Sequence, residues 1–216
     1  AVVSGAASTL LEKDTSLDQS ARLELLRTIH EETDRLERII RNVLNLTRLE
    51  SGAIMVRKEW QPLEEIIGVI LNRFSDRLKE RPLELKIPPD LPIIPFDTLL
   101  MEQVLSNLME NALRHTPTGT PVEITVTPQE SAVMIEIADR GPGIPAHEEE
   151  AIFNKFTRST NTRMGAGIGL SICRVIIEAH GGRIWVENRS GGGAAFKFAI
   201  PVEGTPPTLI PEKDIL

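Results

Sequence analysis

Hydrophobic residues recur at alternating spacings of three and four between Leu17 and Glu50, in a charged stretch without proline. This spacing predicts one long helix with an apolar seam of coiled-coil type. Residues 1–12 are typical of the end of a preceding helix, and 13–18 of a polar turn. One such hairpin cannot bury its own seam, so we expect residues 1–50 to form a homodimer through a four-helix bundle. The seam consists of Leu26, Ile29, Thr33, Leu36, Ile40, Val43 and Thr47, widened by Leu25, Ile39 and Leu46.

After residue 52 the pattern changes to short alternating stretches separated by amphipathic helices. Helices are predicted from Pro62 to Leu78, over Gln103–Thr116 and over Ser171–Ala179. Strands are predicted at Ile54–Trp60, Leu83–Ile87, Pro92–Phe96, Val122–Thr127, Ala132–Asp139, Arg183–Asn188 and Ala194–Pro201. This order predicts an α+β fold, an α/β sandwich in which helices cover one face of a mixed or antiparallel sheet. The expected domains are a helical hairpin at 1–52, the sandwich at 53–202 and a flexible tail at 203–216.

Composition narrows the class of protein. A net charge of −7, with 24 basic residues that form no dense run, argues against a nucleic-acid partner. One cysteine excludes an internal disulfide and fits a reducing compartment. No apolar run reaches membrane-spanning length, and the chain begins as if in mid-helix. We therefore expect a cytoplasmic fragment of a larger protein.

The helix Gln103–Thr116 has an unusual polar face. Asn107 and Asn111 lie one turn apart on it, although Asn is a poor helix former. Neutral carbonyl oxygens and amide donors at this spacing suit a hydrated Mg²⁺ ion held against phosphates. Two solvent-facing Asn residues are the equally simple alternative for this helix taken alone.

Two glycine-containing segments follow this helix. Asp139-Arg-Gly-Pro-Gly143 ends a strand, and its carboxylate could accept a hydrogen bond from the exocyclic amine of adenine, although a plain turn has the same pattern. Gly165-Ala-Gly-Ile-Gly-Leu170 opens a helix, where free N–H groups favour an anion. The stretch 159–164 before it has no periodicity and is typical of a lid. Neither the dinucleotide-binding pattern nor a P-loop is present.

The order of these motifs is more specific than any one of them. An Asn-x-x-x-Asn helix, a strand ending in Asp-x-Gly-x-Gly, a short aromatic-cationic helix at 152–158, a lid and a glycine loop follow one another. This order resembles the ATP-binding domain of sensor histidine kinases, within the wider family that includes gyrase, Hsp90 and MutL. Residues 1–50 are similar to the dimerisation hairpin that precedes that domain. The resemblance also implies attachment to the inner membrane only through regions upstream of this fragment. Segments 57–65, 172–182 and 188–196 resemble the Kdp-type turgor and potassium sensors.

The resemblance implies a role for each matching residue. Asn111 would bind Mg²⁺ and Asn107 would act on the phosphate side, while Asp139 would read the adenine of ATP. Arg114 and His115 stand where the family usually has Lys and Tyr, and Arg differs from Lys in its phosphate geometry. The remaining implied nucleotide contacts are Gly141, Gly143, Ile144, Phe156, Arg158, Gly165, Gly167, Gly169 and Leu170, with Phe153 in the same aromatic box.

The implied function is transfer of the ATP γ-phosphoryl group to a histidine and then to an aspartate of a response-regulator receiver domain. Asn107 cannot act as a general base, so a gyrase-like ATPase is disfavoured. Arg114 and Arg158 would neutralise the charge of the phosphates during transfer. Glu110 is either an accessory base or a solvated residue. His30 is either a phosphoacceptor or an ordinary packed or solvated histidine, and we expect the true acceptor upstream of Ala1, so that the fragment alone is inactive in autophosphorylation.

Two other functions stay open at this point. The chain could be a nucleotide-binding regulatory or phosphatase-biased module without kinase activity, or a dimerisation protein that has lost nucleotide binding.

Overall fold

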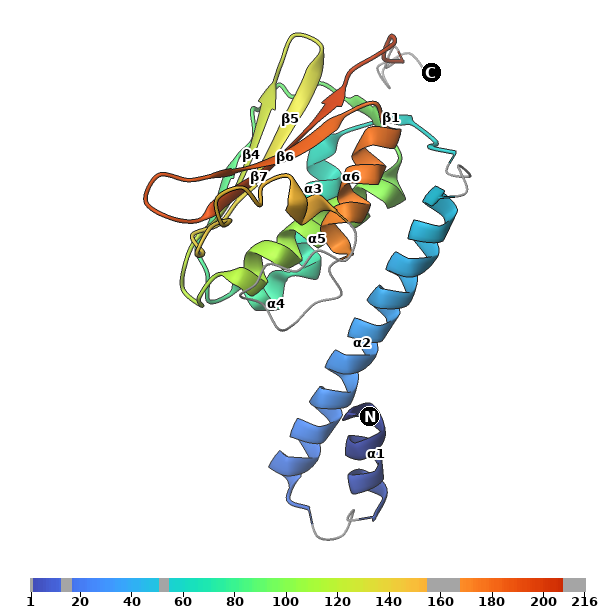
Figure 1. Ribbon diagram of the computed structural model, residues 1–216, viewed down its shortest axis with the longest axis vertical. Helices are drawn as coiled ribbons and strands as arrows, with labels where there is room; N and C mark the ends of the chain where they lie inside the picture. The colour runs from blue at the N-terminus through green and yellow to red at the C-terminus, as the bar shows by residue number, and fades with distance from the viewer. Residues whose placement is uncertain (1, 13–16, 51–54, 155–167, 208–216) are drawn as a thin grey trace, which may run out of the picture. The chain divides into compact units, whose positions relative to one another are not determined.

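The computed structural model describes residues 2–12, 17–50, 55–154 and 168–207. The chain divides into two compact units, Ala1–Gly52 and Ala53–Leu216 (Figure 1). No helix in the described part of the chain is long and apolar enough to cross a membrane.

The first unit is a helical hairpin of α1 (Val2–Glu12) and α2 (Gln19–Glu50). α2 begins two residues after the predicted start at Leu17, because the Asp18 carboxylate accepts a hydrogen bond from the Ala21 amide at 2.7 Å. Within this unit Ala6 is buried, whereas Leu26, Leu36 and Ile40 of the predicted seam are about half exposed in the single chain (47%, 50% and 59%). An apolar seam therefore lies open on α2.

The second unit contains a five-stranded sheet in the order β2-β4-β5-β7-β6. β2 runs parallel to β4 and the other neighbours are antiparallel, so the sheet is mixed, as predicted. A separate ladder joins β1 to β3. The strands are β1 (Glu59–Gln61), β2 (Leu83–Lys86), β3 (Ile94–Phe96), β4 (Val122–Pro128), β5 (Ala132–Ala138), β6 (Arg183–Asn188) and β7 (Ala194–Pro201). The helices are α3 (Leu63–Arg73), α4 (Ser75–Leu78), α5 (Thr98–His115), the 3₁₀ turn η1 (Ala151–Phe153) and α6 (Gly169–Ala179).

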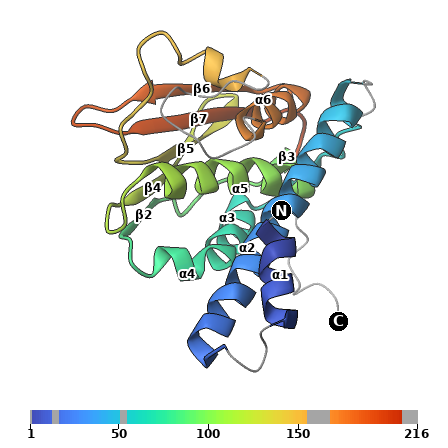
Figure 2. The same ribbon diagram turned by 60° about the horizontal axis from the view of Figure 1, so that its bottom comes forward.

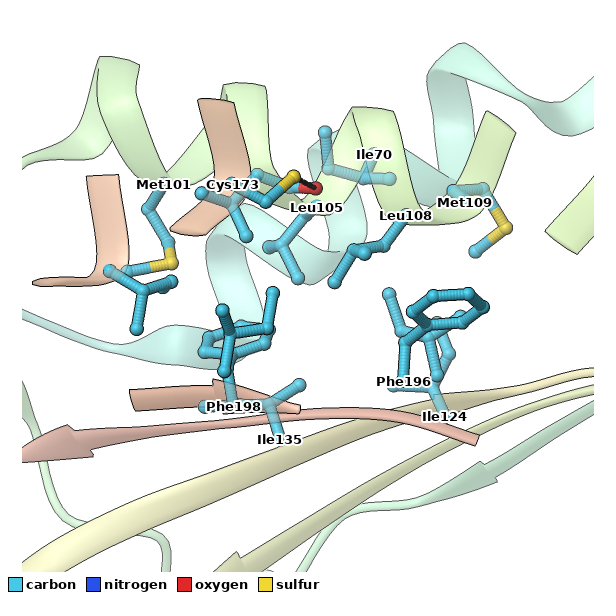
Figure 3. Close-up of a cluster of buried hydrophobic side chains, with 14 of the residues drawn as sticks. Ile70, Met101, Leu105, Leu108, Met109, Ile124, Ile135, Cys173, Phe196 and Phe198 are labelled. Atoms are coloured by element: carbon cyan, nitrogen blue, oxygen red, sulfur yellow. Dashed lines mark hydrogen bonds between the residues drawn. The ribbon is translucent and has the colours of Figure 1, made fainter. Parts of the chain in front are cut away.

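The helices α3, α5 and α6 cover one face of this sheet (Figure 2). Side chains from α5, such as Leu105 and Leu108, meet Ile135 and Phe198 of the strands in a continuous core (Figure 3). One side of α5 is an apolar stripe that is buried: Met101, Val104, Leu105, Leu108 and Ala112 are at most 2% exposed. Burial of this stripe leaves the polar side of α5, with its two Asn residues, facing away from the sheet. The predicted α+β fold is thus confirmed.

Several predicted boundaries were wrong. The strand expected over Ile54–Trp60 is limited to Glu59–Gln61, because its partner β3 offers only three residues. The helix expected to reach Leu78 breaks at Phe74, whose backbone leaves helical geometry (ψ 8°) while its ring is buried. The short helix expected from Ile152 is a single 3₁₀ turn as far as Phe153, and residues 155–167 lie outside the described residues.

His180 joins the start of α5 to the end of α6. Its ring is fully buried, with Nε2 accepting from the Asp97 amide at 3.0 Å and Nδ1 lying 2.8 Å from the Ile176 carbonyl oxygen. The two bonds together require the neutral tautomer protonated at Nδ1. Burial lowers the pKa of His180, and the neighbouring Lys58 lowers it further against opposing effects of Ile176 and Asp97.

Replacement of His180 by Gln should destabilise the second unit by about 1–3 kcal/mol. The Gln amide reaches the position of Nε2 beside the Asp97 amide, but Gln has only a methylene group near the position of Nδ1, so the Ile176 carbonyl oxygen loses its donor. The pH dependence should change as well. The pKa of His180 in the folded protein lies below its value in the unfolded chain, so acidification from about pH 6.5 protonates this histidine in the unfolded chain first. The free energy of unfolding of the wild type therefore decreases as the pH is lowered.

Denaturant unfolding at pH 7.5, 6.5 and 5.5 measures both effects. The H180Q variant should show a shallower loss on acidification than the wild type. His115, whose pKa is also lowered, remains in both proteins and contributes equally. Equal pH slopes in the two proteins would contradict this assignment.

Candidate functional site

The polar face of α5 is in contact with the start of α6. The Asn107 amide Nδ2 donates to the Gly169 carbonyl oxygen at 3.3 Å, although the two residues lie 62 positions apart. A Cβ added to Gly169 would lie 3.7 Å from the Asn107 side chain, so the approach is close but not strained. The structure thus brings together two residues that the sequence placed in one site, and Asn111 lies one turn further along the same helix.

Asn107 also touches Cys173, the one cysteine of the chain. Burial raises the pKa of the Cys173 thiol to about 12, against smaller opposing hydrogen bonds that include one with Asn107. The thiol lies 3.8 Å from the Val104 carbonyl oxygen within the core (Figure 3). A thiol of this kind is protonated and unreactive at neutral pH, so its role is packing beneath the polar face.

Glu110 and Arg114 form a charge cluster with Arg77 of α4. One carboxylate oxygen, Oε1 of Glu110, lies 3.1 Å from the Arg114 guanidinium and 3.6 Å from that of Arg77. Two guanidinium neighbours orient the carboxylate toward them. The arrangement suits a carboxylate that holds Arg114 in place better than one that removes protons from a substrate.

Asp139 lies directly after β5 with its side chain 3% exposed. Among the described residues, hydrogen bonds to its carboxylate come from the amides of Gly141 (2.8 Å) and Ala194 (3.3 Å), and both go to Oδ1. This pattern makes Oδ2 the oxygen that could accept a hydrogen bond from a ligand.

The loop after Asp139 packs against the end of α5. A Cβ on Gly141 would lie 2.6 Å from the His115 carbonyl oxygen, which no side chain tolerates without backbone movement. Gly143 has a positive φ of 77°, and an added Cβ would lie 2.7 Å from the Asn188 side-chain oxygen. Close approach therefore requires glycine at 141, where the loop meets the end of α5, and the positive φ favours glycine at 143, where the loop meets Asn188.

The imidazole of His115 lies between opposing charges. Burial lowers its pKa, the Arg114 guanidinium lowers it further, and the Asp139 carboxylate partly opposes both. His115 is consequently neutral at pH 7 and can donate a hydrogen bond or stack without adding charge.

The remaining predicted residues divide into two groups. Gly169 and Leu170 form the first turn of α6, and Ile144 ends the loop that begins at Asp139. Phe156, Arg158, Gly165 and Gly167 lie outside the described residues. Phe153, expected in the aromatic box, is buried against Phe196 with ring centroids 6.5 Å apart and the Arg174 guanidinium 4.9 Å from its centroid.

Sequence reasoning missed the residues that support the Asp139 loop from behind. Asn188, the last residue of β6, and Arg189, which follows it, contact the backbone of this loop at Ile144 and Asp139 respectively. Their sequence context suggested only a glycine-rich hairpin turn. The polar run Asn188-Arg189-Ser190 directly before three glycines was the available signal.

Comparison with known proteins identifies the same family as the resemblance noted in the sequence. The family described as "Histidine kinase-, DNA gyrase B-, and HSP90-like ATPase" matches residues 96–204. The "His Kinase A (phospho-acceptor) domain" matches residues 1–52. The chain is similar to the sensor protein KdpD of Clostridium acetobutylicum, with 37% identity over 205 residues that cover 93% of this chain and 23% of that protein. The chain thus spans less than a quarter of that relative.

Two solved structures are similar along nearly the whole chain. ShkA in complex with AMPPNP has a TM-score of 0.74 at 26% identity, covering 95% of this chain and 44% of that one. The histidine kinase ThkA in complex with the response regulator protein TrrA has a TM-score of 0.70 at 26% identity, covering 94% of this chain and 58% of that one.

The phospho-acceptor match bears on one expectation. Because it covers residues 1–52, it does not support the prediction that the chain lacks the phospho-acceptor histidine. The predicted family, by contrast, is confirmed over both units. The chain belongs to the sensor histidine kinases of two-component systems and contains their catalytic, ATPase-type region.

Proposed function

We propose that the protein transfers the γ-phosphoryl group of ATP to a histidine and then to an aspartate of a response-regulator receiver domain. The observation that supports this most is the position of α5 between two glycine segments. Its polar face contacts Gly169 through Asn107, and its end contacts the Asp139 loop through His115. A ligand spanning both segments would need a base at one end and phosphates at the other, as ATP has.

The proposed domains are a dimerisation hairpin at 1–52, an ATP-binding domain at 53–202 and a tail at 203–216. Two supporting facts are the division of the chain after Gly52 and the ATPase-family match within the second unit.

Asp139 is the proposed reader of adenine. Its Oδ2 would accept from the exocyclic amine while Oδ1 stays bonded to the loop, and guanine offers a carbonyl oxygen at that position instead. Gly141, Gly143 and Ile144 would lie over the base.

Asn111 is the proposed protein ligand of Mg²⁺. The described residues hold no cluster of three or more His, Cys, Asp or Glu. An amide oxygen with phosphate oxygens and water suits Mg²⁺, which keeps several waters and would neutralise phosphate charge. Asn107 would serve the phosphate side, positioned by its bond to Gly169.

Arg114 and Arg158 are the proposed cations at the phosphates, with His115 beside the base. The amides of Gly165, Gly167, Gly169 and Leu170 would bind the phosphates, and Phe156 would pack beside the nucleotide. Glu110, paired with Arg77 and Arg114, would orient Arg114 and not act as a base. With no carboxylate at position 107 to activate water, hydrolysis of ATP should be slow, so the phosphoryl group survives until a histidine reaches it.

Two macromolecular partners are proposed. A second copy would bind along residues 1–50, where α2 exposes Leu26, Leu36 and Ile40. A receiver domain would bind as the next acceptor, since the structurally similar ThkA forms a complex with its response regulator protein.

Substitution of Asn111 by Ala should reduce incorporation of the ATP γ-phosphate about a hundredfold or more, because the metal ligand is lost. The assay follows labelled phosphate in the 216-residue chain and in an upstream-extended form, with Asn72→Ala, an exposed helical Asn, as control. Unchanged labelling in N111A would refute the metal role. Tight ATP binding by every form without labelling would instead favour a nucleotide-binding regulatory module.

Substitution of Asp139 by Asn should weaken ATP binding about 10- to 100-fold, because a charge-assisted hydrogen bond is lost. The preference for ATP over GTP should fall by a similar factor. Titration calorimetry with both nucleotides measures this, and an unaltered preference would exclude Asp139 as the adenine reader.

Substitution of Leu36 by Glu should convert a dimer to a monomer at micromolar concentration, because the seam would bury an unpaired charge. Leu23→Glu is the matched control, since Leu23 is an exposed Leu of the same helix (60%) outside the predicted seam. Sedimentation velocity measures the mass, and circular dichroism checks that the helices persist. A dimer of unaltered strength in L36E would contradict this interface.

A further inference from the structure

The loop Asp139–Ile144 is bound from behind by the hairpin that joins β6 to β7. Asn188 is the last residue of β6 and pairs with Ala194 across the hairpin. Its side-chain amide makes two hydrogen bonds to one residue, Ile144. Oδ1 accepts from the Ile144 amide at 2.8 Å, and Nδ2 donates to the Ile144 carbonyl oxygen at 2.8 Å.

This pair of hydrogen bonds resembles one hydrogen-bonded pair in a β-ladder, with a side-chain amide in place of a second strand. The pair of bonds therefore fixes the backbone at Ile144. The loop contains two glycines, Gly141 and Gly143, which by themselves would leave its backbone free to take several conformations. Gly143 contacts the same Asn188 oxygen so closely that a Cβ would lie 2.7 Å away.

The other end of the loop is fixed by the Arg189 side chain and lies in close backbone contact with Gly193. Arg189 donates to the Asp139 carbonyl oxygen at 3.3 Å and to the Glu123 carboxylate at 2.7 Å. Glu123 also pairs with Arg140 (3.2 Å) and Lys86 (3.4 Å). Burial alone would raise the pKa of Glu123, but hydrogen bonds from Arg189 and Lys86 hold it below its usual value.

The Asp139 end is thus held more firmly than the Ile144 end. At the Asp139 end, backbone bonds with Ala194, a buried carboxylate and the Arg189–Glu123 pair all contribute. At the Ile144 end, both backbone groups are bonded to the one Asn188 amide. Loss of that amide frees one end of the loop and leaves the other in place.

We propose that Asn188 is a positioning residue for nucleotide binding, which holds the Asp139–Ile144 loop in the shape that receives the base. The proposal rests on the proposed function, because it takes this loop as the base-binding segment. Without Asn188 the loop must be ordered at the moment of binding, and that ordering reduces affinity.

The test compares Asn188→Ala and Asn188→Asp with the wild type in the 216-residue chain. N188D keeps the size of the side chain and the acceptor for the Ile144 amide, but its second oxygen faces the Ile144 carbonyl oxygen, so two acceptors oppose each other. Asn72→Ala is the matched control for loss of an Asn side chain. Titration calorimetry with ATP and ADP, below the unfolding transition of every variant, measures binding by folded protein.

We expect N188A and N188D to lower the affinity for ATP and the affinity for ADP by a similar factor, roughly tenfold. The factors should be similar because the proposed loop contacts the base and not the γ-phosphate. Hydrogen exchange at the Ile144 amide should be faster in both variants without nucleotide and should slow again when ATP binds. A residue that supports only the fold would change the unfolding temperature without changing the affinity of the folded protein.

Wild-type affinities in N188A and N188D, with binding weakened in D139N, would overturn the role of Asn188 and leave the proposed function intact. Unaltered ATP binding in D139N as well as in the Asn188 variants would overturn the proposed function, and this inference with it. Should N188A fail to fold, the isosteric N188D decides by the same criteria.

Discussion

Close backbone approach around Asp139 is the constraint on which the site depends. A Cβ on Gly193 would lie 2.0 Å from the Asp139 carbonyl oxygen, and one on Gly141 would lie 2.6 Å from that of His115. Neither distance is possible for an ordinary residue, so glycine at both positions permits the end of β5, the end of α5 and the β6–β7 hairpin to meet. The conformational entropy that these glycines cost on folding is offset by the buried sheet and helices around them.

The helix α5 carries this arrangement because its two sides have different chemistry. Its apolar side is packed into the core with Ile135 and Phe198, which fixes its rotation about its own axis. The polar side then has one possible direction, and Asn107 meets Gly169 there. Core packing on one side thus determines the position of the amide groups on the other.

Two carboxylates near the site are each paired with several cationic side chains. Glu110 pairs with Arg77 and Arg114, and Glu123 pairs with Arg140, Arg189 and Lys86. The partly exposed pairs contribute little to stability, since solvent screens them. Their effect is orientation: the first cluster directs Arg114, and the second holds the loop backbone through Arg189.

The sequence by itself determined the α+β class and the change from a helical hairpin to alternating elements near residue 52, because periodicity is a local property of the chain. Motif order predicted Asn107, Asn111 and Asp139 as members of one site. The sequence did not determine where helices break, since the Phe74 ring leaves the helix to enter the core. Nor could it find Asn188, Arg189 and Glu123 as supports of the loop, because the bonds Asn188–Ile144, Arg189–Asp139 and Arg189–Glu123 span 44, 50 and 66 positions. Contacts of that range exist only after the sheet has brought its strand ends together, so tertiary structure alone decided them.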